Sequence, residues 1–128
     1  IPIIMQQIHT ENAPKAIGPY SQAIKVGGLV FASGQLPIDM ATGKFPEGIK
    51  EQTRASLTNA AAILKEAGSD LSRVVKTTVF LSDMDNFAAM NEVYAEFFQQ
   101  PYPARSAVAV KTLPKNALVE IECVATTE

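Results

Sequence analysis

Arginine and carboxylate side chains near the C-terminus give this sequence its clearest chemical potential. Arg105 follows a Pro-Ala pair at the start of a short apolar run, and Glu120 and Glu122 lie two residues apart in a later apolar segment. An arginine carries a planar set of N–H donors that matches a carboxylate with two parallel hydrogen bonds, and it stays charged at any working pH. A glutamate nearby can move a proton to or from a bound water molecule. These residue types suffice for a simple reaction on a small carboxylic acid.

The chain lacks the residues that many other catalytic sites need. It contains one histidine, His9, and one cysteine, Cys123. A nucleophile–histidine pair would have to use His9, which lies in an apolar segment near the N-terminus. A four-ligand zinc site cannot be built within a single chain from one residue of each type, so we expect no metal site. A lone cysteine forms no internal disulfide, which fits a reducing compartment. We interpret Cys123 as a small buried apolar residue on a strand.

Length and composition indicate one globular domain. The 128 residues fit a single domain over 1–128, with residues 1–4 interpreted as an addition outside it. Eleven basic and thirteen acidic residues leave a net charge of −2, which argues against a dedicated nucleic-acid binder, whose affinity rests on basic side chains. No apolar run approaches the ~20 residues of a membrane span, and the apolar N-terminus is too short for a signal peptide. We therefore expect a cytoplasmic protein without membrane contact.

Hydrophobic periodicity predicts alternating strands and helices. Strands are expected over residues 3–9, 23–26, 29–33, 73–81, 106–110 and 118–125, the second and third joined by a Gly-Gly hairpin turn. One helix is expected over residues 49–67, ended by Gly68, and Asp83 and Asp85 are N-cap candidates for a second helix. Residues 34–48 are expected to form a loop. This order predicts an α+β fold with two helices packed on one face of a mixed β-sheet.

The last expected strand places its two glutamates on one face. Alternation in residues 118–125 separates Glu120 and Glu122 from the apolar Val119, Ile121 and Cys123. From the residues alone, a solvated strand face explains the two glutamates better than catalysis does. Arg105 alone is likewise explained as a surface arginine.

Several motifs, in this order and spacing, span nearly the whole chain: residues 16–22 (AIGPYSQ), 32–37 (ASGQLP), 75–81 (VKTTVFL), 85–87 with 91–94, and 103–106 followed by 113–114 and 120–122. Together they resemble the RidA (YjgF) family. The resemblance implies a homotrimer with a chorismate-mutase-like fold, in which three sheets form a barrel with the helices outside. Clefts between neighbouring subunits would form the sites. Such a trimer also covers the sheet face that two helices leave open.

The resemblance also implies a reaction. Members of this group hydrolyse reactive enamines and imines, such as 2-aminoacrylate and 2-aminocrotonate, to 2-keto acids and ammonia without a cofactor. Pyridoxal-phosphate-dependent serine and threonine dehydratases release these compounds. By the resemblance, Arg105 binds the substrate carboxylate, and Glu120 orients or deprotonates the attacking water. Glu122 does not match a functional position.

Four further residues match positions of the family's cleft: Tyr20, Ser33, Gly34 and Asn91. Each has a structural explanation as well. Gly34 can serve a bend, Ser33 can satisfy nearby backbone groups, and Asn91 can pair with backbone at a helix. The site therefore depends on whether the fold brings these residues together.

Ala107 departs from the family pattern, because many relatives carry cysteine at that position. The resemblance implies that this residue contacts the ligand through its main-chain carbonyl, which alanine keeps. Hydrolysis is then expected to survive, while any activity that needs the thiol is placed in doubt.

Two other functions stay open from the sequence. Some relatives are described as endoribonucleases or translation inhibitors, although the acidic balance and single histidine of this chain argue against RNA cleavage. A non-catalytic regulatory trimer that binds 2-keto acids in the same cleft would also need Arg105.

Overall fold

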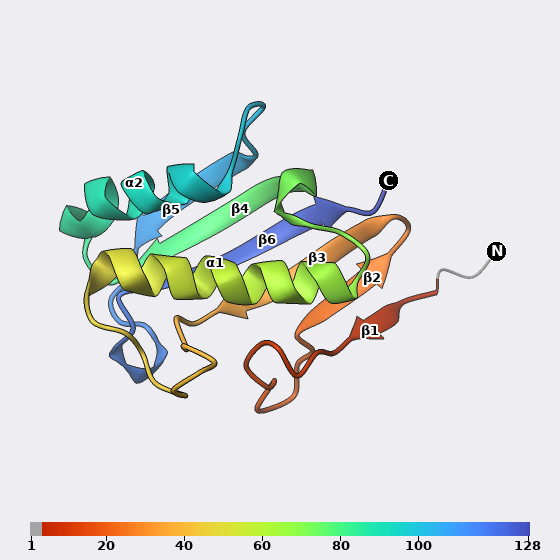
Figure 1. The fold of residues 1–128 in the computed structure, drawn as a ribbon, viewed down its shortest axis with the longest axis horizontal. Helices are drawn as coiled ribbons and strands as arrows, with labels where there is room; N and C mark the ends of the chain where they lie inside the picture. Colours follow the sequence, from red (N-terminus) through yellow and green to blue (C-terminus); the bar gives the residue numbers. More distant parts are fainter. Residues whose placement is uncertain (1–3) are drawn as a thin grey trace.

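The computed structural model describes residues 4–128. In this range the chain forms one six-stranded sheet with two α-helices and three short 3-10 helices (Figure 1). The elements follow in the order β1 (Gln6–Ile8), β2 (Ala23–Val26), β3 (Leu29–Gln35), α1 (Gly48–Glu66), η1 (Leu71–Arg73), β4 (Val74–Leu81), η2 (Met84–Asn86), α2 (Phe87–Phe97), β5 (Ala104–Ala109), η3 (Pro114–Asn116) and β6 (Val119–Thr126). Within residues 4–128, neither helix is long and apolar enough to cross a membrane.

The sheet is mixed, as the sequence predicts. The strands lie side by side in the order β1-β2-β3-β6-β4-β5, and among residues 4–128 the one parallel pair is β4 and β5. The β2–β3 hairpin turns at Gly27 and Gly28, which both have positive φ angles, of 57° and 79°. Glycine adopts these angles without steric cost, so the expected hairpin is confirmed.

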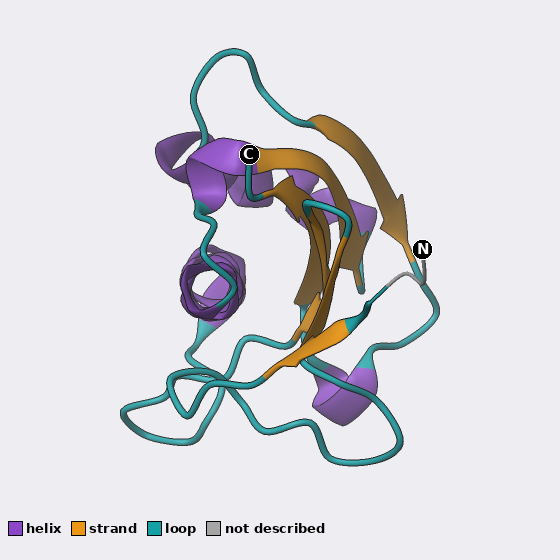
Figure 2. Ribbon diagram, turned by 90° about the vertical axis from the view of Figure 1, so that its right-hand side faces the viewer, coloured by secondary structure: helices purple, strands orange, loops and turns teal. Residues whose placement is uncertain are grey.

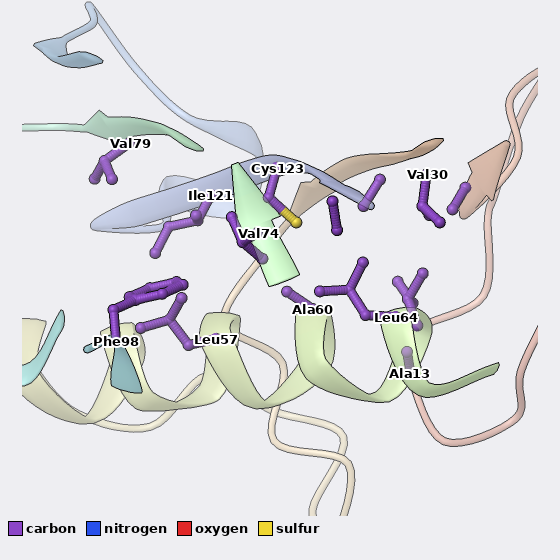
Figure 3. Close-up of a cluster of buried hydrophobic side chains, with 14 of the residues drawn as sticks. Ala13, Val30, Leu57, Ala60, Leu64, Val74, Val79, Phe98, Ile121 and Cys123 are labelled. Atoms are coloured by element: carbon purple, nitrogen blue, oxygen red, sulfur yellow. The ribbon is translucent and has the colours of Figure 1, made fainter. Parts of the chain in front are cut away.

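Both helices pack on the same face of the sheet. Helix α1 lies against β3 and β6, and Figure 2 shows it end-on beside the sheet. In Figure 3, Leu57 and Ala60 of α1 face Ile121 and Cys123 of β6. All four side chains are at most 5% exposed, so they form the centre of the core, and Cys123 is buried as expected.

The expected helix 49–67 is confirmed to within one residue at each end. Helix α1 begins at Gly48 and ends at Glu66, and Gly68 follows with a φ of 84° while its N–H donates to the carbonyl of Lys65. A glycine in this left-handed conformation is a common helix terminator.

Asp83 is confirmed as an N-cap, but it caps a separate short turn, and neither Asp83 nor Asp85 is the N-cap of α2. A separate 3-10 turn, η2, precedes α2, and the side chain of Asp83 caps that turn by accepting a hydrogen bond from the N–H of Asp85 at 2.9 Å. Helix α2 itself begins after Asn86, whose side chain makes no capping bond. The sequence predicts helix from this region onward, and no residue in it predicts the break between η2 and α2.

Two strand boundaries matter for the site. Strand β5 begins at Ala104 instead of residue 106, which places Arg105 inside the strand. Strand β3 extends to Gln35, so Ser33 and Gly34 belong to a strand and the loop starts at residue 36. The expected strand 3–9 is shorter, since β1 covers Gln6–Ile8. Residues 1–3 lie outside the described part of the chain.

The face of the sheet opposite the helices is open in a single chain. Leu29 and Phe31 of β3 and Val108 of β5 are 37–46% exposed there. Their cross-strand partners include Thr126, Val124 and Phe80, respectively. Apolar side chains at this exposure on a sheet face indicate a surface that a further layer could cover.

Candidate functional site

Arg105 is held in place by three side chains of α2. Its Nη1 donates a hydrogen bond to Oδ1 of Asn91 at 2.7 Å. Its Cζ lies 4.7 Å from the ring centroid of Tyr94 and 5.4 Å from that of Phe87. Stacking on aromatic rings and bonding to a neutral amide restrict the guanidinium without neutralising its charge. Arg105 therefore keeps N–H donors and a full positive charge for an anionic ligand.

The support beneath Arg105 is itself fixed. Tyr94 is 5% exposed, and its hydroxyl hydrogen-bonds Oγ1 of Thr77 at 2.8 Å. Burial raises the pKa of Tyr94, so it stays a neutral phenol at working pH. Arg105 borders a cavity of about 450 Å³, named here the Arg105 cavity, with Asn91, Tyr94, Tyr102 and Pro103 among its walls.

Glu120 lies in a second and larger cavity, of about 750 Å³, named here the Glu120 cavity. Its side chain is half-buried on the open face of β6. Burial, and to a smaller extent the charge of Glu122, raises the pKa of Glu120 above its ordinary value. A carboxylate with a raised pKa is a stronger proton acceptor than an ordinary surface carboxylate, which suits acid–base catalysis.

Gly34 makes room for the carboxylate of Glu120. A Cβ added at Gly34 would lie 2.9 Å from Cδ and Oε2 of Glu120, closer than ordinary van der Waals contact. Its φ angle does not lie in the left-handed region, so the backbone would accept alanine. The absent side chain at Gly34 is therefore explained by the close approach of Glu120.

Ser33 and Tyr20 also line the Glu120 cavity. The Ser33 hydroxyl donates to the carbonyl of Ser21 at 2.6 Å, which leaves its oxygen able to accept a hydrogen bond from a ligand. Tyr20 is 53% exposed at the cavity wall. Three of the residues that match the family's cleft, Tyr20, Ser33 and Gly34, thus lie together around Glu120.

Arg105 and Glu120 lie on opposite faces of the sheet. Arg105 pairs with Thr77 of β4, and Thr77 pairs with Cys123 of β6, so these three side chains share the face that the helices cover. Glu120 is three residues before Cys123 on β6. Since side chains alternate along a strand, an odd separation puts Glu120 on the open face.

Their separation along the sheet is also large. The cross-strand row of Arg105 lies three residues, or about 10 Å, from the row of Glu120 along the strands, and β4 separates their two strands. Adjacent carbon atoms in a small acid are about 1.5 Å apart. A small carboxylic acid bound to Arg105 therefore does not reach Glu120 of the same chain.

Ala107 lies on the helix-covered face, two residues after Arg105 on β5 and paired with Val79. It is half-buried against the core. Asn91, Arg105 and Ala107 thus form one group of candidate residues, and Tyr20, Ser33, Gly34 and Glu120 form the other.

The lone cysteine and histidine lie outside both cavities. Burial, and to a smaller extent the charge of Glu122, raises the pKa of Cys123 to about 12. His9 pairs with Glu11 at 2.9 Å near the N-terminus. Among residues 4–128, no three His, Cys, Asp or Glu side chains gather in a way that could hold a metal ion.

Sequence reasoning missed several walls of the two cavities. Lys15, Ile17 and Lys115 line the Glu120 cavity, and Tyr102 lines the Arg105 cavity. Tyr102 directly precedes the Pro-Ala-Arg-Ser motif, which is a signal that could have found it. Lys115 adopts a φ of 56°, a left-handed conformation that lysine rarely takes, and no feature of its sequence predicts it.

Comparisons with known proteins find relatives that match almost the whole chain. A family model described as Endoribonuclease L-PSP matches residues 10–127. A RutC family protein of Pyrococcus horikoshii is 59% identical over 119 residues, which is 92% of this chain and 94% of the relative. A protein of Capra hircus named 2-iminobutanoate/2-iminopropanoate deaminase is 48% identical over 96% of this chain and 90% of its own length. The crystal structure of RidA from the Antarctic bacterium Psychrobacter sp. PAMC 21119 superposes with a TM-score of 0.91 at 47% identity, covering 94% of this chain and 98% of that chain.

Proposed function

The chain belongs to the YjgF/RidA family, and on this premise we propose that it hydrolyses reactive enamines and imines to 2-keto acids and ammonia. Its substrates are 2-aminoacrylate, 2-aminocrotonate and their imine tautomers, which would make it a 2-iminobutanoate/2-iminopropanoate deaminase. Serine and threonine dehydratases that use pyridoxal phosphate supply such compounds, so a functional link to those enzymes is part of the proposal. The protein itself would use no cofactor.

The observation that carries the proposal is that the chain holds two chemically complementary groups, each prepared by its own surroundings. Arg105 is oriented by Asn91 and Tyr94 while its charge stays available for a carboxylate. Glu120 faces a cavity and has a raised pKa. An imino acid presents a carboxylate beside an electrophilic carbon, which are the two features that these groups recognise.

The two groups would act in sequence on one substrate. Arg105 binds the carboxylate of the imine with two parallel hydrogen bonds. Glu120 takes a proton from water as the water oxygen forms a bond to the imine carbon, and passes that proton to the imine nitrogen to give a carbinolamine. Glu120 then takes the hydroxyl proton of the carbinolamine and gives it to the nitrogen as the C=O bond forms and the C–N bond breaks, so that ammonia leaves a 2-keto acid. Because the uncatalysed addition is easy, positioning supplies much of the benefit.

A single chain holds these groups on opposite faces, so the proposed site combines two subunits. Arg105, Ala107 and Asn91 would come from one subunit, and Glu120 with Gly34 from its neighbour. A homotrimer in which three sheets form a barrel would cover the exposed face that carries Leu29, Phe31 and Val108, and it would create three such sites. Its expected mass is about three times the 13.7 kDa of the chain.

The first test removes the carboxylate-binding group. Arg105→Ala is expected to lower kcat/KM for imine hydrolysis about tenfold to a hundredfold, since one charge-assisted hydrogen bond contributes ~1.5–3 kcal/mol. Arg105→Lys should recover only part of this loss, because an ammonium group keeps the charge without the planar pair of donors. Ammonia and keto-acid release in an assay coupled to a dehydratase measures both. The matched control is Arg73→Ala, an arginine that lines neither cavity. Wild-type hydrolysis by Arg105→Ala would refute the assignment.

The second test asks whether the site is shared between subunits. Arg105→Ala and Glu120→Gln proteins are unfolded, mixed in equal amounts and refolded together. If one subunit provides Arg105 and its neighbour Glu120, random mixing restores about a quarter of the sites. Activity that stays at the level of the two separate variants would contradict a shared site.

The same experiments separate the alternatives. A non-catalytic 2-keto-acid-binding trimer would bind pyruvate through Arg105 in calorimetry and give no ammonia above the uncatalysed rate. RNA cleavage, which the name of the family model suggests, would persist in Arg105→Ala and Glu120→Gln if it used other residues.

A further inference from the structure

The segment between β1 and β2 forms one wall of the Glu120 cavity. Residues 10–22, named here the N-terminal arm, contribute Pro14, Lys15, Ile17, Tyr20 and Gln22 to that wall. Ile17 is 82% exposed and Tyr20 is 53% exposed, so neither is held by burial within the chain. Their position therefore depends on how the arm is attached at its base.

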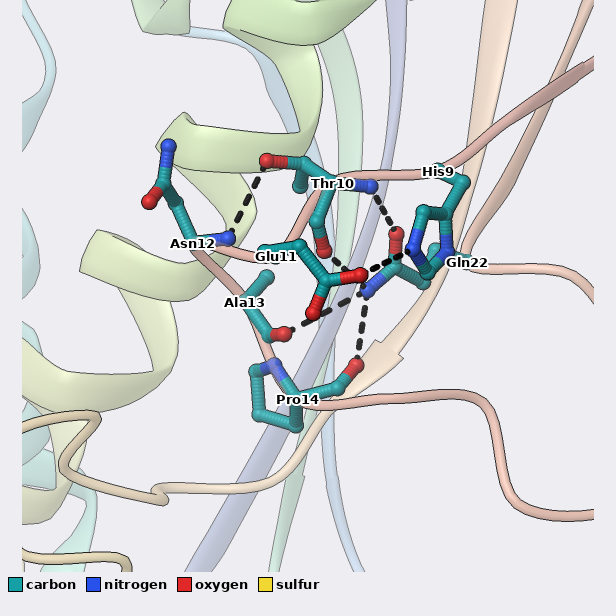
Figure 4. Close-up of polar contacts among 7 residues, drawn as sticks. All are labelled: His9, Thr10, Glu11, Asn12, Ala13, Pro14 and Gln22. Atoms are coloured by element: carbon teal, nitrogen blue, oxygen red, sulfur yellow. Dashed lines mark hydrogen bonds and ion pairs between the residues drawn. The ribbon is translucent and has the colours of Figure 1, made fainter.

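The side chain of Gln22 provides that attachment. Its Oε1 accepts a hydrogen bond from the N–H of Thr10 at 2.8 Å, and its Nε2 donates to the carbonyls of Thr10 at 3.1 Å, Ala13 at 3.4 Å and Pro14 at 2.8 Å. Figure 4 shows the arm bending around this amide. Gln22 is 2% exposed, so water does not compete for these bonds. One amide thus fixes both ends of the turn that leads into Lys15 and Ile17.

The main chain of Gln22 also reaches the opposite wall. Its carbonyl accepts a hydrogen bond from the N–H of Ser33 at 2.9 Å, and the Ser33 hydroxyl bonds the carbonyl of Ser21. Ser33 precedes Gly34, which packs against Glu120. Gln22 therefore joins the arm to the strand that lies beside the carboxylate.

We propose that Gln22 is a positioning residue that sets the place of the N-terminal arm over the Glu120 cavity and thereby the affinity for substrate. Its side chain lies at the cavity wall and, within residues 4–128, hydrogen-bonds main-chain groups of the arm and neither Glu120 nor Arg105, so it acts through the arm that carries Lys15, Ile17 and Tyr20. The inference rests on the proposed imine hydrolysis at this site. Loosening the arm lowers the fraction of molecules ready to bind, which weakens binding in proportion and leaves the chemical step intact.

The variants Gln22→Met and Gln22→Glu test this role in the whole protein. Methionine keeps the length of the side chain and removes its polar atoms. Glutamate keeps the acceptor for Thr10 and turns the donor into an acceptor that faces three carbonyls, so it should loosen the arm further. For Gln22→Met we expect KM for the imine and Kd for pyruvate to rise about fivefold or more, with kcat within about twofold of wild type. Gln22→Glu should show a larger rise.

A matched control separates positioning from general destabilisation. Ser69 is also buried and donates a side-chain hydrogen bond to a main-chain carbonyl, that of Thr126 at 2.7 Å, away from both cavities. Ser69→Ala is expected to leave KM and Kd unchanged. An equal rise in Ser69→Ala, or a fall in kcat at constant KM in Gln22→Met, would overturn the proposal.

Hydrogen exchange gives a readout that does not depend on turnover. In Gln22→Met, amides of residues 10–20 should exchange at least about tenfold faster than in wild type while those of α1 stay unchanged. If the Gln22 variants do not fold, the exchange rate of the Thr10 amide in the wild-type protein is the test. The hydrogen bond of this amide to Gln22 predicts slow exchange, and fast exchange there overturns the inference. A wild-type protein that binds pyruvate and does not hydrolyse imines would refute the proposed reaction, while the exchange data would still test Gln22.

Discussion

Gly34→Ala is a sharp test of the Glu120 cavity. The new Cβ would lie 2.9 Å from Cδ and Oε2 of Glu120 and 3.1 Å from its Cγ. Ordinary contact begins at 3.4 Å, so the carboxylate must move by at least about 0.5 Å, the difference between 3.4 and 2.9 Å. Because a 1 Å displacement of a reacting group can cost about a hundredfold in rate, we expect kcat/KM to fall roughly tenfold or more.

The fold should tolerate the same change. The atoms that must move belong to the end of a flexible, half-buried side chain, and the backbone of Gly34 accepts alanine. Alanine also reduces the freedom of the unfolded chain, which stabilises by about 0.4–1 kcal/mol where the conformation is compatible. We therefore expect a free energy of unfolding within about 1 kcal/mol of wild type.

Kinetics of imine hydrolysis and denaturant unfolding measure the two effects side by side. The control is Gly34→Ala combined with Glu120→Ala, in which the new methyl group has no carboxylate to displace. In a double-mutant cycle, any stability cost of Gly34→Ala should then disappear. If Gly34→Ala hydrolyses imines with wild-type kcat and KM, the carboxylate does not act from the position that the structure gives it.

Three further predictions concern Glu120, Cys123 and Ala107. The raised pKa of Glu120 means that the folded state binds its proton more tightly than the unfolded state, so ionisation removes stability as the pH rises through that pKa. Glu120→Gln should therefore raise the melting temperature at pH 7 and not at about pH 4, and calorimetry showing equal shifts at both would contradict this. Cys123, with its pKa raised to about 12, should resist thiol reagents at pH 8 until the protein is unfolded, and a fast reaction in the native state would refute its burial. Ala107→Cys should leave hydrolysis within about twofold of wild type and add a thiol that reagents modify, whereas a large gain in turnover would show that the side chain contributes.

The sequence predicts the elements of this fold well where periodicity is strong. Alternation in β6 places Glu120 on the face opposite Ile121 and Cys123, and the structure confirms it. The apolar spacing before Gly68 predicts α1 to within one residue at each end. These patterns are local, because a strand or helix that buries one face carries apolar residues at a regular spacing in its own sequence.

The arrangement of the candidate site depends on contacts between segments far apart in the chain, and the residue pattern of each segment does not predict those contacts. That Arg105 shares a face with Cys123 depends on β5 pairing in parallel with β4 and on the register that aligns Thr77 with Arg105. A shift of one residue would turn Arg105 to the other face. The support of Arg105 by Tyr94 likewise comes from a helix that only tertiary packing places there. The attachment of the N-terminal arm by Gln22 joins residues up to twelve positions apart through a single side chain.

Placing Arg105 and Glu120 on opposite faces makes the two halves of the proposed chemistry independently adjustable. Within one chain, substitutions in α2 change the aromatic rings under Arg105 and not the residues around Glu120, while changes in the N-terminal arm or at Gly34 do the reverse. Affinity for the acid group and reactivity of the water could thus drift separately among descendants of one ancestral chain. A relative that kept the first and lost the second would become a sensor of 2-keto acids without any change in architecture.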